Sequence, residues 1–334
     1  MANIANIVTA LGNFHRKRPE IIAGLQKFFG MTSRKYLKSY ENVKDELPLI
    51  VDYLGDIVQK GGPLKAWNPT TNAYSFQARI LKVRWFEVNL EENIEYVAQS
   101  ALAEFQSQGT YTRPYAFEKI FIEKVLKQLL QNLERAVWRA VYDPTPTAAG
   151  VADVMTIIDG IEQLVTSNIA SCNVVTTGTV DATNAISKLD NIWGAVPAEL
   201  QNDGAKMYVP PQVFRNYLLN QNSRNINYMN FWASMPSKET DGDQTAYKPL
   251  YLDSSGGLCE IVPIKAKQGT NRIICDPARV LSMGTDLFTE FFNMQFKDAL
   301  DFKNVRIFCA GKIGVQAAAL QIGTLKYLTV SDVA

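Results

Sequence analysis

The sequence predicts an α+β fold organised around one unusually long helix. Three observations support this prediction. Residues 115–142 carry an unbroken helical pattern with no glycine and no internal proline. Residues 150–290 alternate between short helical and short strand patterns. Residues 63–92 place apolar and aromatic residues on both sides of the turn signal "NPTTN", which is typical of a β-hairpin.

Composition sets broad limits on the function. The chain has 334 residues, 47% of them hydrophobic, so it can bury a sizeable core, and its length predicts about two domains. A net charge of +1 argues against a general nucleic-acid binder. The four cysteines have no paired spacing and are expected to be reduced core residues. No signal peptide and no stretch of ~20 apolar residues is present, so we expect no membrane association.

Residues 1–62 are predicted to form an N-terminal arm of short helices. Apolar residues recur at helical spacing over 3–14, 21–29 and 49–57, and basic or glycine-rich segments separate these stretches. Through Lys44 the chain has eight basic and two acidic residues. Arg16, Lys17 and Arg18 are therefore candidates for contact with nucleic acid, and a solvated basic arm is the alternative.

The hairpin at 63–92 carries two sets of apolar residues. Tyr74, Phe76 and Ile80 share one parity, whereas Leu81, Val83 and Trp85 take the other. A strand cannot place both sets on one face without a bulge, so we expect both faces to be covered, one of them by another subunit. The candidate residues for contact between subunits are the aromatic side chains of this segment: Trp67, Tyr74, Phe76, Trp85 and Phe86. The alternative is that these side chains pack in the core of their own subunit.

The long helix at 115–142 has a continuous apolar stripe at i, i+3, i+4 and i+7 spacing. At 1.5 Å per residue it would span about 42 Å. A coiled coil is the alternative, but no second long helical pattern exists to pair with it. We therefore expect a spine that packs on a sheet, with Pro114 at its start and Pro144 after its end. Its expected core residues are Ile122, Leu126, Leu129, Leu133 and Val137.

The following segment predicts several further elements. Val154 to Val165 is helical in pattern, "CNVVTT" is a strand, and the next helix has Asp181 as its expected N-cap. "KMYVPP" is a strand that leads directly into the helix "QVFRNYLLNQN". Strands are also expected at "LCEIVPIKA" and "NRIICDP", and alternation from Val305 to Cys309 predicts a closing strand.

No motif for catalysis or metal binding is present. His15 is the single histidine, which excludes histidine-based triads and His/Cys zinc sites. Asp241 and Asp243 lack the twelve-residue loop of a calcium site, and a solvated loop is the preferred interpretation. We expect no cofactor, no metal and no enzyme activity. An enzyme that acts through carboxylates alone stays open as an alternative.

The order of these elements resembles one family across nearly the whole chain. Three segments carry the resemblance: "PYAFEKIFIEKVLKQLLQNLERAVWRAVYDP", "AKMYVPPQVFRNYLL" and "KIGVQAAALQIGTLKYL". They are similar to the major capsid proteins of tailed double-stranded DNA phages. The resemblance implies an N-arm (1–62), an E-loop hairpin (63–92), a P-domain (93–149) with its spine helix, an A-domain (150–290) and closing P-domain strands (291–334).

The same resemblance implies a structural function. Such proteins self-assemble into pentamers and hexamers of an icosahedral shell, in a virion whose proteins are made in the host bacterial cytoplasm. The implied partners are other copies of the chain, portal, decoration or scaffolding proteins, and packaged double-stranded DNA contacted non-specifically. Some family members crosslink a hairpin lysine to a neighbour, but we expect no crosslink at Lys65 or Lys82. An encapsulin-like compartment that encloses cargo enzymes is the alternative with the same fold.

Overall fold

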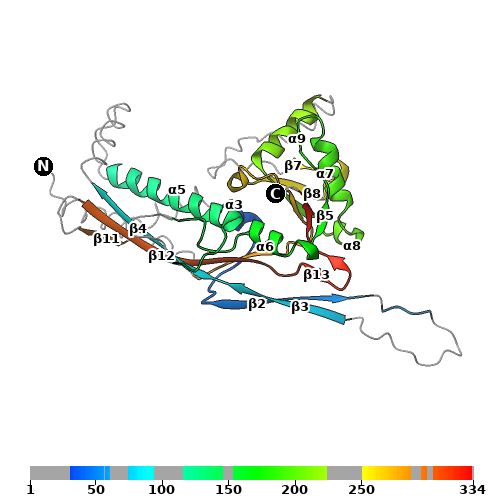
Figure 1. The fold of residues 1–334 in the computed structure, drawn as a ribbon, viewed down its shortest axis with the longest axis horizontal. Helices are drawn as coiled ribbons and strands as arrows, with labels where there is room; N and C mark the ends of the chain where they lie inside the picture. The colour runs from blue at the N-terminus through cyan, green and yellow to red at the C-terminus, as the bar shows by residue number, and fades with distance from the viewer. Residues whose placement is uncertain are drawn as a thin grey trace.

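The computed structural model describes residues 31–55, 57–60, 74–93, 116–145, 153–223, 250–286, 295–298 and 304–332. These residues form a long sheet with one long helix over it, a compact α/β part at one end, and a hairpin that extends past it (Figure 1). The predicted helices at 3–14 and 21–29 lie outside the described residues, as do Arg16, Lys17, Arg18 and Trp67.

The long sheet is built around strand β12 (Asn304–Ala317). One edge of β12 pairs antiparallel with β4 (Arg84–Asn93), from Asn304 opposite Asn93 to Ile313 opposite Arg84. The other edge pairs with β11 (Gln295–Asp298) and then with β10 (Leu281–Thr285), and β10 pairs in parallel with β1 (Lys38–Tyr40). The predicted closing strand is therefore present, and it is the centre of the sheet.

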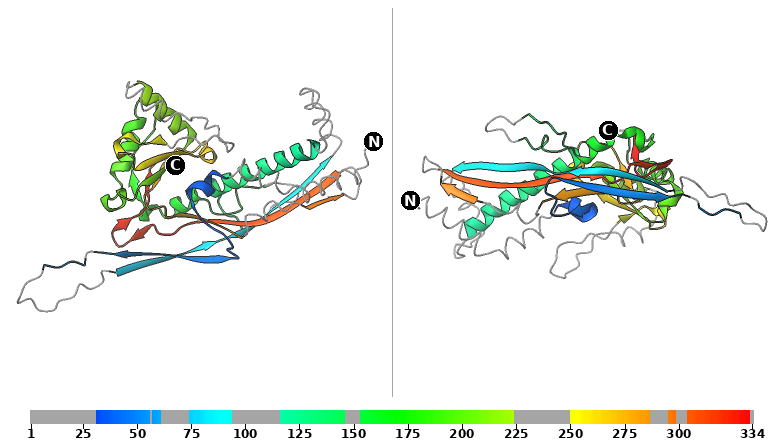
Figure 2. Two further views of the ribbon diagram at one scale, coloured as in Figure 1. Left: turned by 180° about the vertical axis from the view of Figure 1, so that it is seen from behind. Right: turned by 90° about the horizontal axis from the view of Figure 1, so that it is seen from below.

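Helix α5 (Ala116–Arg139) is the predicted spine and lies over one face of the long sheet (Figure 2). Its 24 residues span about 36 Å. All five expected core residues of the stripe are 5% exposed or less. The helix ends at Arg139, before Pro144: the backbone N–H groups of Val141 and Asp143 donate to the carbonyls of Met155 (2.8 Å) and Thr156 (3.1 Å). Gly160 packs against the last turn, where a Cβ would lie 2.8 Å from the Ala136 carbonyl oxygen.

The compact α/β part contains a six-stranded sheet. Its strand order is β5 (Asn173–Val175), β15 (Thr329–Ser331), β9 (Ile274–Asp276), β6 (Ala205–Val209), β8 (Cys259–Pro263) and β7 (Leu250–Tyr251). Around it lie helices α7 (Ala185–Gly194), α8 (Ala198–Gln201) and α9 (Pro211–Ser223), and the short turns η1 (Ile169–Ser171) and η2 (Asp253–Ser255). Helix α6 (Ile161–Ser167) packs against α5 and β12, and the turn η3 (Lys265–Lys267) packs against α5. The strands predicted at "CNVVTT", "KMYVPP", "LCEIVPIKA" and "NRIICDP" are all present.

Two strands cross the predicted division between the α/β segment and the closing segment. β10 lies within the predicted 150–290 segment but pairs with β12 in the long sheet. β15 lies within the predicted 291–334 segment but pairs with β5 and β9 in the six-stranded sheet. The described chain therefore passes three times between the two sheets, from β4 to β5, from β9 to β10 and from β12 to β15. Neither sheet corresponds to one continuous range of the sequence.

Two helix predictions need local correction. The segment 154–165 is helical only from Ile161, because residues 153–160 form turns against the end of α5. The N-cap of α7 is Asn184, not Asp181. The Asp181 carboxylate instead accepts hydrogen bonds from the backbone N–H groups of Thr183 (2.7 Å) and Asn184 (3.1 Å) in the preceding turn.

The helix predicted at 49–57 is wrong. Residues Glu46–Leu54 form strand β2, which pairs antiparallel with β3 (Tyr74–Lys82) from Glu46 opposite Lys82 to Leu54 opposite Tyr74. The hairpin therefore begins at Glu46, within the segment predicted as the N-terminal arm, and its second strand ends at Lys82. Residues 84–92, predicted to be hairpin, belong instead to β4 (Arg84–Asn93) of the long sheet.

The alternation of buried residues changes parity between Val83 and Phe86, where the chain passes from the hairpin to the long sheet. Two glycines that face each other in the long sheet, Gly284 and Gly314, make room for this crossing. A Cβ at Gly314 would lie 2.1 Å from the Lys82 carbonyl oxygen, and a Cβ at Gly284 would lie 2.7 Å from Leu81 Cδ2. Only a residue without a side chain permits backbone to approach so closely.

The remaining described elements are short. Helix α3 (Thr32–Tyr36) packs beside α5, and strands β13 (Gln321–Ile322) and β14 (Leu325–Lys326) form a small hairpin before β15. All four cysteines are buried and unpaired, as the sequence predicted.

Candidate inter-subunit surface

One face of the β2–β3 hairpin is exposed and largely apolar. Because side chains alternate along a strand, every second residue of β2 and β3 lies on this face. Ile50 is 69% exposed, Phe76 is 70% exposed and Tyr74 is 61% exposed. We call this surface the hairpin outer face; it consists of Pro48, Ile50, Asp52, Leu54, Tyr74, Phe76, Ala78 and Ile80.

The opposite face of the hairpin is attached to the chain's own core. Leu49 and Leu81 are buried there. The Gln316 side chain donates to the Ile80 carbonyl (3.0 Å) and accepts from Arg79 Nη2 (3.3 Å). Gln77 Oε1 accepts from the backbone N–H of Leu320 (3.2 Å). The hairpin is thus held by its inner face, and the outer face is the surface it leaves to solvent.

Polar contacts occur at the margins of the hairpin outer face. Lys82 Nζ forms an ion pair with Glu46 Oε1 (2.8 Å) at its base, and the Tyr74 hydroxyl donates to Asp52 Oδ2 (3.3 Å). The hydrogen bond to Glu46 and the charge of Glu46 raise the pKa of Lys82. The absence of a crosslink at Lys82 stays a prediction, and Lys65 lies outside the described residues.

Trp85 and Phe86 lie on opposite faces of β4. Phe86 is 5% exposed and packs in this chain's own core, so its prediction as an inter-subunit residue is wrong. Trp85 is 69% exposed, and Lys312 Nζ lies 4.6 Å from its ring centroid in a cation–π contact. Trp85 therefore belongs to the outer face of the long sheet and not to the hairpin.

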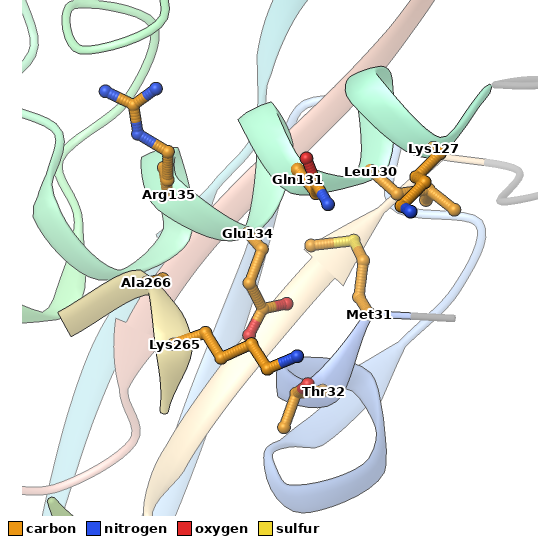
Figure 3. A pocket seen from close by; sticks show the side chains of 9 residues that line it. All are labelled: Met31, Thr32, Lys127, Leu130, Gln131, Glu134, Arg135, Lys265 and Ala266. Carbon is orange, nitrogen blue, oxygen red and sulfur yellow. The ribbon is translucent and has the colours of Figure 1, made fainter. Parts of the chain in front are cut away.

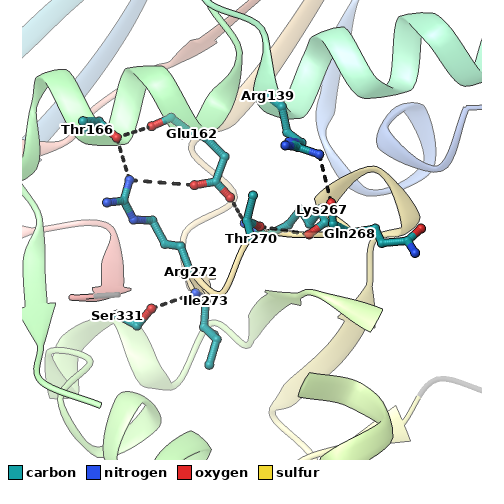
Figure 4. Close-up of polar contacts among 9 residues, drawn as sticks. All are labelled: Arg139, Glu162, Thr166, Lys267, Gln268, Thr270, Arg272, Ile273 and Ser331. Carbon is teal, nitrogen blue, oxygen red and sulfur yellow. Dashed lines mark hydrogen bonds and ion pairs between the residues drawn. The ribbon is translucent and has the colours of Figure 1, made fainter. Parts of the chain in front are cut away.

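A cluster of buried charges joins α5 to α6 and η3 (Figure 4). Lys267 is fully buried and pairs with Glu162, and Arg272 Nη1 lies 3.7 Å from the second oxygen of the same carboxylate. Arg272 Nη1 also donates to Thr166 Oγ1 (2.6 Å). Burial lowers the pKa of Lys267. The Lys267 ammonium lies 5.5 Å from the ring centroid of Trp138 on α5, so this cluster links α5 to α6 and η3.

The sequence did not indicate this cluster, because lysine and arginine in a polar segment are usually exposed. Its charged groups bind one another inside a single chain, which favours a structural role. In the described part of the chain, no group of three or more His, Cys, Asp or Glu residues is arranged to hold a metal ion. Asp241 and Asp243 lie outside that part. None of the helices in the described ranges is both long enough and apolar enough to cross a membrane.

Comparison with known proteins finds likeness in structure alone. No protein-family model and no curated protein matches the sequence. A chain of the satellite phage P4 procapsid, in a structure that includes the size determination protein Sid, superposes with a TM-score of 0.57 at 7% identity, covering 94% of this chain and 89% of that chain. A chain of the cyanophage A-1(L) capsid gives 0.54 at 11% identity (91% and 92% covered). A chain of mycobacterium phage Adephagia gives 0.50 at 11% identity (91% of both chains covered).

The likeness covers nine-tenths of each chain, so it extends to both sheets and the long helix. The chain therefore has the α+β fold of tailed-phage capsid proteins, as its sequence predicted.

Proposed function

We propose that this chain is a major capsid protein, which self-assembles into pentamers and hexamers of an icosahedral shell around a double-stranded DNA phage genome. The observation that carries the proposal is the structural likeness to chains of phage capsids along nearly the full length of this chain. The hairpin outer face supports it independently, because it is an apolar surface for which the described part of a single chain provides no cover.

The hairpin outer face suits contact with a second copy of the chain. A two-stranded hairpin is at best marginally stable in water, and a contiguous exposed apolar face usually marks an interaction site. Ile50, Phe76 and Tyr74 are each more than half exposed, so burial against a neighbour would remove most of their apolar surface from water. Every copy carries the same hairpin outer face and the same surface that would receive a neighbour's hairpin, which allows closed rings of identical subunits.

The described part of the chain outside the hairpin suits a rigid subunit of a shell. Helix α5 is joined to α3 by a buried polar network in which the Ser33 hydroxyl donates to Glu134 Oε1 (2.8 Å) and Trp138 Nε1 donates to Ser33 Oγ (2.8 Å). Burial raises the pKa of Glu134, and the hydrogen bonds from Ser33 and Trp138 oppose that rise. This network adds to the buried stripe of α5 and supports a function that needs a rigid subunit.

The proposal includes further partners and a location. Other copies of the chain are the main partners, with portal, decoration or scaffolding proteins and packaged DNA in addition. The protein would reside in the virion after synthesis in the host bacterial cytoplasm. A cargo compartment and a carboxylate enzyme are the competing functions, and no specific observation in the described residues favours either. We propose that the chain has no catalytic role.

The test is assembly of the purified full chain. We expect sedimentation and negative-stain microscopy to show closed particles, and particles from the native source to absorb at 260 nm as nucleic acid does. A chain that stays a monomer or dimer under all conditions would overturn the shell proposal. Native particles with the absorbance of pure protein would overturn the proposal that the shell encloses a genome, and would favour the cargo compartment.

A further inference from the structure

A lysine without a charged partner lies where the six-stranded sheet meets α3. Lys206 on β6 is 9% exposed, yet in the described part of the chain its ammonium makes no hydrogen bond and no ion pair. Its Nζ atom lies 4.7 Å from the centroid of the Tyr36 ring, in a cation–π contact. A buried ammonium without an acceptor is costly, so Lys206 indicates a partner that the single chain does not supply.

Two further cations lie beside Lys206. Lys35 on α3 places its Nζ atom 5.3 Å from the centroid of the same Tyr36 ring, and Arg279 lies in the turn between β9 and β10. Both side chains are exposed, and neither forms an ion pair within the described ranges. Burial lowers the pKa of Lys206, and the nearby charges of Arg279 and Lys35 lower it further. We call the group formed by Lys35, Tyr36, Lys206 and Arg279 the junction cluster.

Two carboxylates of the same chain face the junction cluster and do not neutralise it. Glu260 on β8 and Asp276 on β9 lie opposite Lys206 in the sheet. Asp276 is buried and accepts hydrogen bonds from the backbone N–H groups of Val280 (2.9 Å) and Leu281 (3.1 Å). Among the described residues, neither carboxylate forms an ion pair with a cation of the cluster. Three cations therefore face two carboxylates, which leaves a net positive charge.

The junction cluster is held in place from both sides. The Tyr208 hydroxyl, also on β6, donates to the Tyr36 carbonyl (3.3 Å). Glu134 of α5 points to the start of α3 (Figure 3), where it accepts hydrogen bonds from the backbone N–H (3.1 Å) and the hydroxyl (2.8 Å) of Ser33. Arg279 has a φ of 50°, a backbone conformation that is rare for residues other than glycine. Strained backbone of this kind is concentrated at binding sites.

The occupant that fits the junction cluster is a single carboxylate on a flexible side chain. The net charge requires an anion, and because Lys206 is 9% exposed, a narrow group reaches its ammonium more easily than the wide surface of duplex DNA does. The chain itself carries a complementary surface, which we call the acidic segment. Residues 189–205 include Asp190, Glu199 and Asp203 and no basic residue. Glu199 and Asp203 are exposed, and neither forms an ion pair in the described part of the chain.

We infer that the junction cluster of one copy binds a carboxylate of the acidic segment of a neighbouring copy. The inference rests on the proposed function and names one contact through which subunits meet. The two surfaces differ, so the contact is heterologous, and heterologous contacts between identical subunits can close into rings. The carboxylate would give the Lys206 ammonium a charge-assisted hydrogen bond. Because this bond forms between copies, it stabilises the assembly and not the isolated subunit.

Lys206→Met separates these two stabilities, because methionine keeps the apolar part of the side chain and removes the ammonium. Urea unfolding of the unassembled full chain should give a free energy of unfolding equal to or above that of the wild type. Sedimentation velocity should show particles only at a protein concentration raised about tenfold or more. The control Arg215→Met, at an exposed position of α9, makes the same change in charge and should assemble at the wild-type concentration.

Four results would overturn the inference. A strongly destabilised Lys206→Met subunit would show that the ammonium has its partner within its own chain. Assembly of Lys206→Met at the wild-type concentration would show that the ammonium needs no partner. Equal weakening by Arg215→Met would show that net charge governs assembly. Weakening by Lys206→Met that occurs only when DNA is present would show that the occupant is nucleic acid.

A carbodiimide crosslink identifies the partner, because this reagent joins a lysine amine directly to a neighbouring carboxylate. Particles are assembled from a mixture of unlabelled and isotope-labelled subunits, so mass spectrometry distinguishes bonds between copies from bonds within one copy. We expect Lys206 or Lys35 of one copy to be joined to Glu199 or Asp203 of another. Crosslinks within one copy alone, or to an acidic peptide outside residues 189–205, would contradict the inference. A wild-type chain that never forms particles would instead overturn the proposed function itself.

Discussion

Replacing Phe76 by alanine should leave the subunit folded and weaken its assembly. Full burial of a phenylalanine side chain stabilises by about 1.5–3 kcal/mol. Phe76 is 70% exposed in the single chain, so less than a third of that value, under about 1 kcal/mol, contributes to the stability of the subunit itself. The rest, about 1–2 kcal/mol per contact, becomes available when a neighbour covers the hairpin outer face.

Phe86→Ala is the matched control, because it removes the same side chain from a buried position. Phe86 is 5% exposed and packs in the core beneath β4. Large-to-small changes of a buried phenylalanine cost about 3–5 kcal/mol, which includes the cavity left behind. We therefore expect Phe86→Ala to destabilise the subunit by several times more than Phe76→Ala.

Two assays separate the effects. Urea unfolding of the unassembled subunit measures the free energy of unfolding of each variant. Sedimentation velocity over a range of protein concentrations measures the concentration at which particles form. A loss of 1–2 kcal/mol per contact corresponds to about a 5–30-fold change in an association constant. Phe76→Ala should raise the assembly concentration by at least that factor, because every subunit of a shell repeats the defect.

Two results would refute the reasoning. If Phe76→Ala destabilises the isolated subunit as much as Phe86→Ala does, Phe76 is part of the subunit's own core. If Phe76→Ala forms particles at the wild-type concentration, the hairpin outer face is not a principal contact between copies. Particles that form only at raised concentration, from a subunit of near wild-type stability, would support the proposal.

Three further predictions concern the folded subunit. Gly314→Ala should strongly destabilise it in thermal unfolding, because the new Cβ would lie 2.1 Å from the Lys82 carbonyl oxygen; a wild-type melting temperature would contradict the close crossing. Leu129→Asp should abolish folding as seen by circular dichroism, because a charge buried at a 5% exposed site costs several kcal/mol, whereas Gln128→Asp on the exposed face should fold. Burial raises the pKa of Asp276 to about 6 from an ordinary value of 3.8. Its contribution to stability is therefore complete below about pH 4 and is lost as the pH rises through 6, by up to about 3 kcal/mol. Urea titrations from pH 4 to 7 should show this decline for the wild type and not for Asp276→Asn.

The sequence by itself determined the features that depend on local periodicity. The stripe from Ile122 to Val137 repeats every three or four residues, so the long helix was predictable with an error of a few residues at its end. Alternation likewise placed Tyr74, Phe76 and Ile80 on one face of a strand, and all three are exposed. Whether that face contacts a neighbouring copy stays a prediction.

Only the tertiary structure decided which segments pair. The apolar residues from Leu49 to Leu54 suit either a helix or a strand, and they form a strand because Tyr74–Lys82 lies beside them. Trp85 and Phe86 are adjacent aromatics, yet one is exposed and the other buried, because pairing of β4 with β12 sets which of them faces the core. The return of β15 to the six-stranded sheet has no local signal either.

The physical reason is the distance along the chain between the groups that stabilise each element. A helix satisfies its backbone hydrogen bonds within four residues, so its pattern is complete in a short stretch of sequence. A strand satisfies them with a partner that can lie anywhere in the chain, and a one-residue change of register exchanges its two faces. The exposed surface of the hairpin and the buried charge of Lys267 follow from that long-range pairing and packing, which the local pattern does not contain.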